Sequence, residues 1–494
     1  MSWIDRFAAF FSPSWAASRA RSRLALRHYE AAQPGRRTSA WHKSSTDVNA
    51  AAQPALTSLR ELSRDLRRNN DWVKRGINVL ANNTVGWGIV PKPGAGRSRA
   101  RSAAAIEAWN DWAASTECDF DGRLNFYGLQ RLVMTTIAES GEALVVLQPP
   151  APGWSAIPMR VQVLEPDHLD ASKQGATTAG GRIIAGVEFD ARNARVAYWL
   201  YPDHPGSRSS LARMASVRVP ADRVIHVYEV ERPGQVRGIP WLASAISKIK
   251  DLDEYEDAIL VGQKIAACLS AFVTDIDGGG PAIGQQDADD AKLEHLEPGQ
   301  ITYLPPGKNV TFSAPPAVQD GPFSARALRR IAASLGITYE ELTGDYSQVN
   351  FSSSRMARLA AWQSIHVWRE HMMIPQLCEG VWRWAMGLVT LERAWPEIPR
   401  ATWAGPPMPM LDPAAEGLAY SRLARNGVMT IGQILQEQGY DPMQQLDEIQ
   451  NYNAELDRRG IVLDLDPRKT SGAGQQQAAA ASATAPPDAA ANTA

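Results

Sequence analysis

Residues that could carry out catalytic or metal-binding chemistry are scattered along this chain and match no established pattern. Residues 279–284 have the glycine spacing of a phosphate-binding loop, but Gln285 and Gln286 stand where such a loop needs Lys and Ser or Thr. His366 and His371 are five positions apart, whereas a helical zinc site needs histidines four apart. No GxSxG motif occurs. The sequence therefore predicts that the protein is not an enzyme and holds no cofactor or metal.

Two further groups of residues have the composition of metal ligands. Residues 119–122 (Asp-Phe-Asp-Gly) look like part of a calcium loop, but Gly128 then occupies the position that needs a bidentate Glu. We predict a turn that leads into the next helix instead. His168, His204 and His226 lie at or near predicted strand ends, and their spacing matches no ligand pattern. Turn and surface positions are therefore favoured over a three-histidine site.

The longest element that the sequence predicts is an amphipathic helix over 241–273. It follows the turn residues Pro233, Gly234 and Gly238, and Pro240 suits a first helical position. At 1.5 Å per residue such a helix would be about 50 Å long. Apolar residues recur along it at helical spacing: Ile246, Ile249, Leu252, Tyr255, Ile259, Ile265, Leu269 and Phe272. A helix of this kind must pack against other helices, in its own chain or in neighbours.

The segments before this helix predict an α+β protein. Helices are expected at 13–32, 57–83, 100–115 and 125–140, with an extended arm at 33–57. The period then changes to two over 141–235, where β-branched and aromatic residues alternate between turns. This change indicates an antiparallel β domain. Trp109 and Trp112 lie three apart on one helical face, which is more typical of a core than of a base-stacking surface.

The segments after the long helix return to short elements. A small β-rich unit is expected at 274–320, with a hairpin that carries Lys308 and Asn309 at its tip. A helix follows and stops at Gly336, and a helical turn at 339–342 leads into a polar loop.

The polar loop ends at a second long helix. Ser352 to Ser354 are suitable N-cap residues, and the helix that they begin must bend at Pro375. Short helices are expected within 413–457. Beyond them the composition is Ala, Gln, Thr, Ser and Pro, which predicts a disordered tail.

Charge is unevenly distributed, although the net charge is only −2. Residues 1–75 hold 14 Arg and Lys against six acidic residues, so the rest of the chain carries about −10. Such a basic region either contacts nucleic acid or an acidic partner, or is a solvated face balanced by acidic neighbours. The three scattered cysteines argue against a disulfide scaffold. No run of 18 apolar residues occurs, so we expect no membrane-spanning helix.

Several segments, in this order and spacing, resemble the portal proteins of tailed bacteriophages, in the lambda-like family. They are LRELSRDLRRNN (59–70), NTVGWGI (83–89), VLEPDHLD (163–170), VAYWLYPDHP (196–205), VIHVYEVERPGQVRG (224–238), LEPGQITYLPPGKNV (296–310) and SLGITYEELTGDYSQVNFSSSR (334–355). The resemblance extends from about residue 15 to about residue 455.

The resemblance implies a function and a set of partners. Family members form a ring, here expected to have about twelve copies, at one capsid vertex of the virion after assembly in the host cytoplasm. The implied channel conducts double-stranded DNA during packaging and ejection. The implied partners are the terminase large subunit, a head–tail adaptor, and the major capsid and scaffold proteins, with no membrane contact.

The resemblance also divides the chain into the parts of a portal subunit. These parts are a basic N-terminal helix and arm (1–56), a wing (57–240), a first stem helix (241–273), a clip (274–320), a second stem helix (321–336), a channel loop (337–354), a bent helix (352–390), a helical crown (391–460) and a disordered tail (461–494).

Three sets of residues take functional positions in this mapping. In the channel loop, Gln348, Asn350 and Arg355 are expected nearest to DNA. The full sets are the loop residues Thr343, Ser347, Gln348, Asn350, Ser352 and Arg355, the stem-wall acids Asp251, Asp253, Glu254 and Asp257, and the clip residues Lys308 and Asn309 for partner contact. Neutral polar groups give weak contacts that are independent of base sequence. An acidic wall repels phosphate, whereas a basic wall would hold DNA through counterion release.

Alternatives remain open from the sequence. The loop could be an ordinary surface connection. The protein could also be a non-channel structural protein of the virion, such as a capsid or baseplate scaffold that uses helix 241–273 as an interaction rod. Rings with a central hole in negative-stain images would distinguish a channel from such a scaffold.

Overall fold

The computed structural model describes residues 36, 45–93, 99–153, 156–209, 215–267, 270–275, 285–286, 292–293, 308–313, 322–410, 412–463 and 468–469. The chain forms two compact units, residues 1–54 and 55–494. The predicted helix 13–32 lies outside the described residues, as does most of the predicted tail 461–494. All sites discussed below lie in the second unit.

The first two described helices correct two predictions. Helix α3 (Val48–Asn69) begins inside the segment predicted as an extended arm, and α4 (Asp71–Val85) follows it after one residue. The sequence predicted one helix over 57–83. The helix is interrupted because the Asn70 side chain accepts a hydrogen bond from Val73 N and so caps a new helix. The stripe that includes Val73, Ile77 and Leu80 is buried as predicted.

Two helices with an aromatic core follow, close to their predicted limits. They are α5 (Arg99–Ala114) and α6 (Phe126–Ser140), joined through the short helix η2 (Thr116–Cys118). Trp109 and Trp112 are fully buried, and the Trp109 ring lies 5.0 Å from Phe126 and 5.2 Å from Trp382. The prediction that both tryptophans belong to the core is confirmed.

Two antiparallel sheets follow these helices, as predicted for 141–235. The order in the three-stranded sheet is β3-β2-β9, and in the five-stranded sheet it is β4-β5-β6-β7-β8. The strands are β2 (Glu142–Gln148), β3 (Arg160–Leu164), β4 (Gly175–Ala176), β5 (Arg182–Ile184), β6 (Val187–Phe189), β7 (Arg195–Leu200), β8 (Val217–Pro220) and β9 (Val224–Tyr228), with short helices η3 (Pro166–His168) and η4 (Ala221–Arg223).

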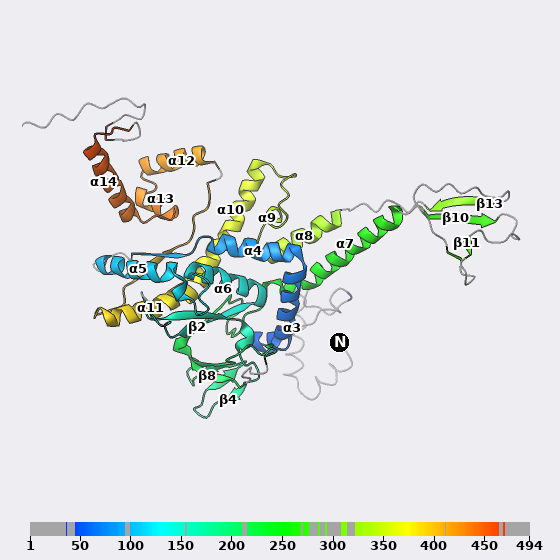
Figure 1. The fold of residues 1–494 in the computed structure, drawn as a ribbon, viewed down its shortest axis with the longest axis horizontal. Coiled ribbons are helices and arrows are strands. Elements are labelled where there is room, and N and C mark those ends of the chain that lie inside the picture. Colours follow the sequence, from blue (N-terminus) through cyan, green and yellow to red (C-terminus); the bar gives the residue numbers. More distant parts are fainter. Residues whose placement is uncertain are drawn as a thin grey trace, which may run out of the picture. The chain divides into compact units, whose positions relative to one another are not determined.

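Strand β2 is buried on both faces because a core lies on each side of it. Its alternate side chains point to opposite faces. Ala143 and Val145 belong to the large core shared with α4, α5 and α6, whereas Leu144 and Val146 belong to a smaller core between the two sheets. In Figure 1 the helices lie on one side of β2, and β4 and β8 lie on the other.

A close contact between two glycines joins this sheet to the next helix. A Cβ atom on Gly238 would lie 2.1 Å from the Gly141 carbonyl oxygen. A Cβ atom on Gly141, whose φ is +89°, would lie 2.4 Å from the Ile239 carbonyl carbon. Both positions therefore need glycine, which explains the RGIP segment in physical terms.

The helix predicted over 241–273 is shorter than expected. A short helix η5 (Trp241–Ser244) precedes α7 (Ile246–Ala267), which at 1.5 Å per residue is about 33 Å long. The segment after it is strand β10 (Ser270–Asp275), which pairs antiparallel with β13 (Lys308–Ser313). Strands β11 (Gln285–Gln286) and β12 (Lys292–Leu293) also pair with each other. The β-rich character of the predicted clip is thus confirmed for its described residues.

The chain then returns through a series of helices in the predicted order. They are α8 (Pro322–Ser334), α9 (Tyr339–Thr343), α10 (Phe351–Trp368), the π-helical segment η6 (Arg369–Cys378) and α11 (Glu379–Glu392). Gly336 stops α8 at a φ of +67°, as predicted. Pro375 lies inside η6, so the proline is accommodated by a wider helical turn rather than by a break.

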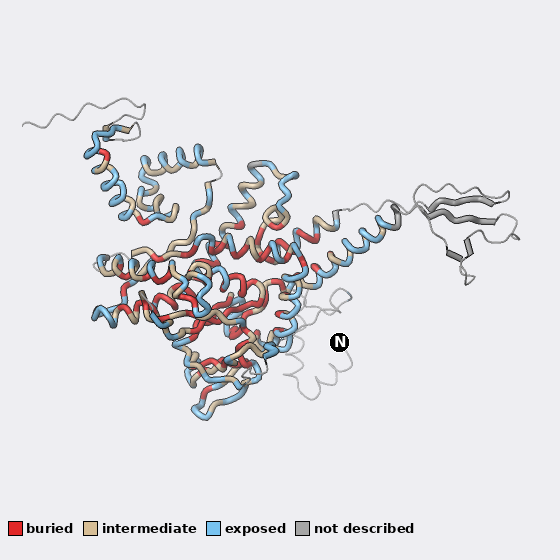
Figure 2. Tube along the Cα trace, in the orientation of Figure 1, coloured by how far each residue is buried: buried red, intermediate tan, exposed pale blue. Residues whose placement is uncertain are grey.

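The C-terminal part contains one strand that the sequence did not predict. Strand β14 (Ala401–Ala404) pairs antiparallel with β1 (Val90–Pro93). The short helices expected after it are α12 (Pro413–Arg425), α13 (Ile431–Glu437) and α14 (Pro442–Arg459). Figure 2 shows that these three helices and most of α7 are exposed, whereas buried residues gather around the sheets and α4 to α6. No helix in the described ranges is long and apolar enough to span a bilayer.

Candidate functional site

The predicted channel-loop residues lie between the end of α9 and the start of the second turn of α10. Thr343 Oγ1 donates a hydrogen bond to Tyr339 O over 2.9 Å. Ser347, Gln348 and Ser352 are exposed. Thr343 therefore shapes the loop, while the other three residues present polar side chains to solvent.

Asn350 has a structural role in this loop. Its Oδ1 accepts a hydrogen bond from Ser353 N over 2.9 Å, and Ser353 Oγ accepts one from Asn350 N over 3.2 Å. This reciprocal pair is a capping box. The prediction that Ser352 to Ser354 cap the helix is wrong, because they lie inside its first turn.

The Arg355 side chain is partly exposed but already contacts another residue. Its Nη2 lies 3.7 Å from Glu416 Oε1 on α12, so it contacts the predicted crown. The Arg355 side chain is 43% exposed. Of the three residues expected nearest to DNA, Gln348 alone is exposed without a structural contact among the described residues.

The predicted stem-wall acids do not share one environment. Asp251 pairs with Lys248 over 2.8 Å, and Glu254 lies 3.8 Å from Lys250. Asp257 is exposed.

Asp253 differs because it contacts Asn70 at the start of α4. Its Oδ1 accepts a hydrogen bond of 2.7 Å from Asn70 Nδ2 at the start of α4, and burial raises the pKa of this carboxyl group. Asp253 is therefore a contact between α7 and the start of α4, and the exposed acids on α7 are Asp251, Glu254, Glu256 and Asp257.

The clip residues are part of a strand. Lys308 stands opposite Asp275, and Asn309 opposite Thr274, in the β10–β13 ladder. Their described partner is the distant strand β10, while residues 301–307 of the predicted hairpin lie outside the described residues. Local spacing around Pro305 to Gly307 could not reveal a partner more than 30 residues away.

A buried charge cluster around Glu142 was not predicted from the sequence. The Glu142 side chain is completely buried. Its Oε1 accepts from Arg60 Nη2 over 2.5 Å and from Arg237 Nε over 2.8 Å. Its Oε2 accepts from Gly238 N over 2.7 Å and lies 2.8 Å from His226 Nε2. One carboxylate thus joins α3, β9 and the RPGQVRG segment to the start of β2.

Electrostatics fix the protonation states in this cluster. Burial alone would raise the pKa of Glu142, but Arg237 and Arg60 hold it well below its ordinary value. Burial lowers the pKa of His226 despite the neighbouring carboxylate. A neutral His226 that donates from Nε2 therefore fits the geometry, and its buried Nδ1 has no hydrogen-bond partner among the described residues. Burial also lowers the pKa of Arg60, to about 10, so it stays charged at neutral pH.

We expect acid to destabilise the protein partly through His226. Because its folded-state pKa lies below the ordinary 6.5, the stability it contributes is present above pH 6.5 and is lost as pH falls below it. His226→Gln keeps a neutral donor for Glu142 and removes this dependence. Denaturant midpoints measured from pH 7 to pH 5 should therefore fall less steeply in the variant. Parallel curves for the two proteins would contradict the assignment.

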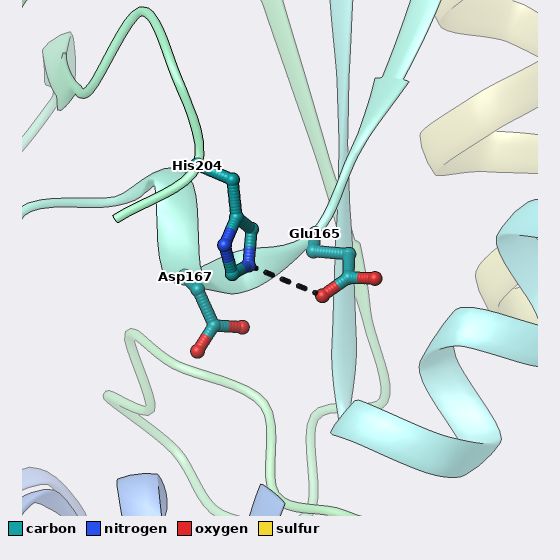
Figure 3. Close-up of side chains that lie close together, drawn as sticks. All are labelled: Glu165, Asp167 and His204. Atoms are coloured by element: carbon teal, nitrogen blue, oxygen red, sulfur yellow. Dashed lines mark ion pairs between the residues drawn. The ribbon is translucent and has the colours of Figure 1, made fainter. Parts of the chain in front are cut away.

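Glu165, Asp167 and His204 lie close enough to hold a metal ion (Figure 3). His204 Nε2 lies 3.5 Å from Glu165 Oε2. Arg64 already pairs with both carboxylates: its Nη2 lies 2.8 Å from Glu165 Oε2 and also bonds Asp167. A guanidinium in this position supplies the positive charge that a metal would bring. The arrangement fits a salt-bridge cluster between α3 and the sheet better than a cation site.

The three histidines considered from the sequence do not form one site. The rings of His168 and His204 lie 5.5 Å apart, but His168 Nδ1 lies 2.9 Å from Tyr201 O. His226 belongs to the Glu142 cluster. Residues 119–122 form the predicted turn, in which the Asp119 carboxylate accepts from the backbone of Arg123 and Leu124.

Comparison with known proteins decides the family. A family model described as phage portal protein, lambda family, matches residues 34–369. The chain belongs to this family. The probable portal protein of Halomonas phage phiHAP-1 is 27% identical over 467 residues, which cover 88% of this chain and 86% of that protein. Portal protein B of Escherichia phage lambda is 24% identical over 358 residues, which cover 65% and 67% of the two chains.

A solved structure is also similar to this portal chain. A chain in the neck of a native gene transfer agent particle, computed with C12 symmetry, is 14% identical, with a TM-score of 0.46, over 80% of this chain and 99% of that one. As a phage portal protein, the chain is a component of the virion and a structural protein rather than an enzyme. The family predicted from the sequence is confirmed.

Proposed function

We propose that this portal protein assembles into a closed ring of about twelve copies whose bore conducts double-stranded DNA during packaging and ejection. The same ring would dock the terminase large subunit and a head–tail adaptor, and would contact the major capsid and scaffold proteins. The mapping of wing, stem, clip, channel loop and crown given above belongs to this proposal.

The observation that carries the proposal is the uncovered far half of α7. Near its start, Ile249 and Leu252 are completely buried against the wing. Farther along, Leu260 and Val261 are 49% and 52% exposed. Apolar side chains on a projecting helix gain free energy when another surface covers them. Neighbouring copies of the same helix, arranged around an axis, would provide that cover.

The C-terminal helices support the same interpretation. Neither α12 nor α13 contains a buried residue. Large apolar side chains of this region are half-exposed or more: Leu418, Val428, Ile431, Tyr440, Leu446 and Tyr452. These three helices bury few apolar side chains of their own. Contacts with the same helices of adjacent copies would cover the exposed side chains and complete the core.

The charges along the proposed bore favour passage of DNA over its capture. Lys248 and Lys250 pair with Asp251 and Glu254, so these four charges largely cancel, and the exposed carboxylate of Asp257 leaves a net negative charge that would repel phosphate. Ser347 and Gln348 offer neutral groups at the loop. Neutral contacts to the DNA backbone are weak and independent of base sequence.

The ring is tested directly by imaging and mass measurement. Negative-stain images of the purified full chain should show rings with a central hole, and native mass spectrometry should give one multiple near twelve copies. Images of rods or irregular assemblies without a hole would instead favour the non-channel scaffold. A protein that stays monomeric at high concentration would contradict both.

Positive charge added to the channel loop is expected to slow DNA passage. Ser347→Arg combined with Gln348→Arg adds two cations per copy, so counterion release would make the loop hold DNA. Packaged DNA per particle should fall about tenfold at low salt and recover as salt is raised. Thr178→Arg, in the exposed turn between β4 and β5, is the control and should package normally. If both variants package equal amounts of DNA, Ser347 and Gln348 do not line the bore.

A further inference from the structure

Helix α3 is attached to the rest of the second unit mainly through arginines. Three of them lie three or four positions apart, so they share one face of the helix. Each pairs with acid on a different segment: Arg60 with Glu142 of β2, Arg64 with Glu165 and Asp167 at η3, and Arg67 with Glu139 of α6. Apolar contact is small by comparison, because Leu66 is the one α3 side chain that packs against either apolar core, and Leu62 is 49% exposed. The attachment therefore depends on charge more than on apolar burial.

Arg60 is the buried anchor of this attachment. Its side chain is 6% exposed, compared with 18% for Arg64 and 30% for Arg67. Ion pairs that are open to solvent contribute little, whereas a buried arginine needs its counter-charge. Apart from Glu142, Arg60 donates to Ser140 O over 3.3 Å. Whether α3 stays attached therefore depends on the balance of charge around Glu142.

His226 offers a further protonation site in this cluster. Its Nε2 lies 2.8 Å from Glu142 Oε2, whereas its Nδ1 is buried without a hydrogen-bond partner in the described part of the chain. A second proton on the ring would place three cations around one carboxylate. The groups that face His226 from the surrounding elements are Glu142 of β2, Arg237 of the segment before η5, Arg195 and Tyr198 of β7, and Tyr228 of β9 itself. Of these, Glu142 alone is negative at neutral pH, so the added charge is not offset.

Arg60 is the cation that this added charge would displace. Arg237 is held by two more acceptors, since it also donates to Ala185 O over 3.0 Å and to Pro166 O over 3.3 Å. His226 belongs to strand β9, which is paired with β2 along its length. Arg60 has a single neutral acceptor and lies on a helix outside the sheets. When Arg60 leaves, a charged His226 takes its place, and the net charge of the cluster is the same as before protonation.

We propose that residues 55–69 of α3 form an acid-released strap, which detaches from the rest of the second unit when His226 takes up a second proton. Detachment would expose the carboxylates of Glu139, Glu165 and Asp167. Because α3 runs from the first unit into the second, detachment would also lengthen the connection between the two units. This inference does not depend on the ring.

The direction of the pH dependence follows from linkage. Burial is the largest cause that holds the pKa of His226 below 6.5 while the strap is attached. Detachment admits water and removes the Arg60 cation, and both changes raise this pKa. The detached state therefore binds the proton more tightly, so detachment is favoured as pH falls below 6.5.

A thiol placed on the hidden face of α3 reports detachment directly. Ser63 is completely buried, and its hydroxyl makes no hydrogen bond to a described residue, so Ser63→Cys is a mild change. Leu62→Cys, at the neighbouring exposed position, is the matched control for thiol reactivity at each pH. Labelling of the full chain by a pyridyl disulfide, followed by peptide mass spectrometry, gives the ratio of the two rates. This ratio should rise about tenfold between pH 7.5 and pH 5.5.

Three further variants, each made in the Ser63→Cys chain, assign the release. His226→Gln should abolish the rise, and Arg60→Gln should give a high ratio at both pH values. Arg68→Gln removes the same charge from an exposed position on the same helix and should behave like the parent. A ratio that does not change with pH would overturn the strap. A rise that persists in His226→Gln would also overturn it, because another group would then control the release.

Tryptophan fluorescence separates detachment from unfolding. Residues 48–69 contain no tryptophan, so the signal reports on the rest of the chain. It should stay constant over the pH range in which the thiol becomes reactive. A fluorescence change in step with labelling would show that the whole core opens, which would contradict a separately released strap.

Discussion

Glu142→Gln is expected to lower the free energy of unfolding by about 3–5 kcal/mol. The substitution preserves the shape of the side chain and removes its negative charge. Arg60 and Arg237 would then remain buried beside each other without a counter-charge, and removal of one partner from a buried ion pair costs far more than the pair contributes. Denaturant unfolding of the full chain, followed by fluorescence of its 16 tryptophans, which include the buried Trp109 and Trp112, measures the loss.

Two further variants give this prediction its controls. Glu61→Gln removes the same charge from an exposed position on α3 and should change stability by less than about 0.5 kcal/mol. Arg237→Met combined with Glu142→Gln removes one cation together with the anion, so it should destabilise less than the sum of the single changes. A loss below about 1 kcal/mol for Glu142→Gln would show that the cluster tolerates two unpaired cations, contrary to the argument.

Elements with local signals were predicted well from the sequence. Helices α5 and α6 were expected at 100–115 and 125–140, close to their observed limits. Their ends are fixed by neighbours in the chain: Asn125 caps α6 through Gly128 N, and Gly141 ends it in a left-handed conformation. The strands between β2 and β9 were likewise visible as apolar alternation between turns.

Elements that depend on distant partners were misjudged. Apolar spacing continues without a break through Leu269 and Phe272, so a single long helix was expected where α7 gives way to β10. Pairing with β13 decides that change, and pairing between β1 and β14 decides the structure of a proline-rich segment. Neither pairing can be recognised from the local spacing of apolar residues.

The candidate functional residues also divide into those that could be recognised from the local sequence and those that required the fold. The polar character of the loop around Gln348 was visible in the sequence, whereas the contact of Arg355 with Glu416 required the fold. In the Glu142 cluster, Arg60 lies 82 residues away in sequence and Arg237 lies 95 residues away. The local signal was an acid at the start of an otherwise apolar strand. Because an acid needs a partner only where it is buried, this signal could not be interpreted before the burial of Glu142 was known.

Arg369→Met is expected to lower the free energy of unfolding by about 3–4 kcal/mol and to loosen the connection between the end of α4 and the segment that leads to the C-terminal helices. Arg369 is buried, and its guanidinium donates to Thr84 O over 2.6 Å, to Asn83 O over 2.8 Å and to Pro406 O over 2.8 Å. Burial lowers its pKa to about 10, so it is still charged at neutral pH.

The charge of Arg369 suits this position for two reasons. The Thr84 and Asn83 carbonyls belong to the last turn of α4, where the helix dipole is negative. The guanidinium also lies 5.1 Å from the Trp362 ring centroid, which adds a cation–π contact on α10. One side chain therefore connects the end of α4, helix α10 and the segment that leads to α12.

Hydrogen exchange can separate this connection from a general loss of stability. Arg369→Met should increase exchange at residues 83–86 and 401–407 well before it does so at the buried strand β2. Arg369→Lys keeps the charge but cannot reach all three carbonyls, so it should give an intermediate effect. Arg358→Met, on the same run of helix and without an ion pair in the described ranges, should leave these segments protected. Uniform exchange across the chain in Arg369→Met would mean that Arg369 supports the whole core rather than the link between the end of α4 and the segment that leads to α12.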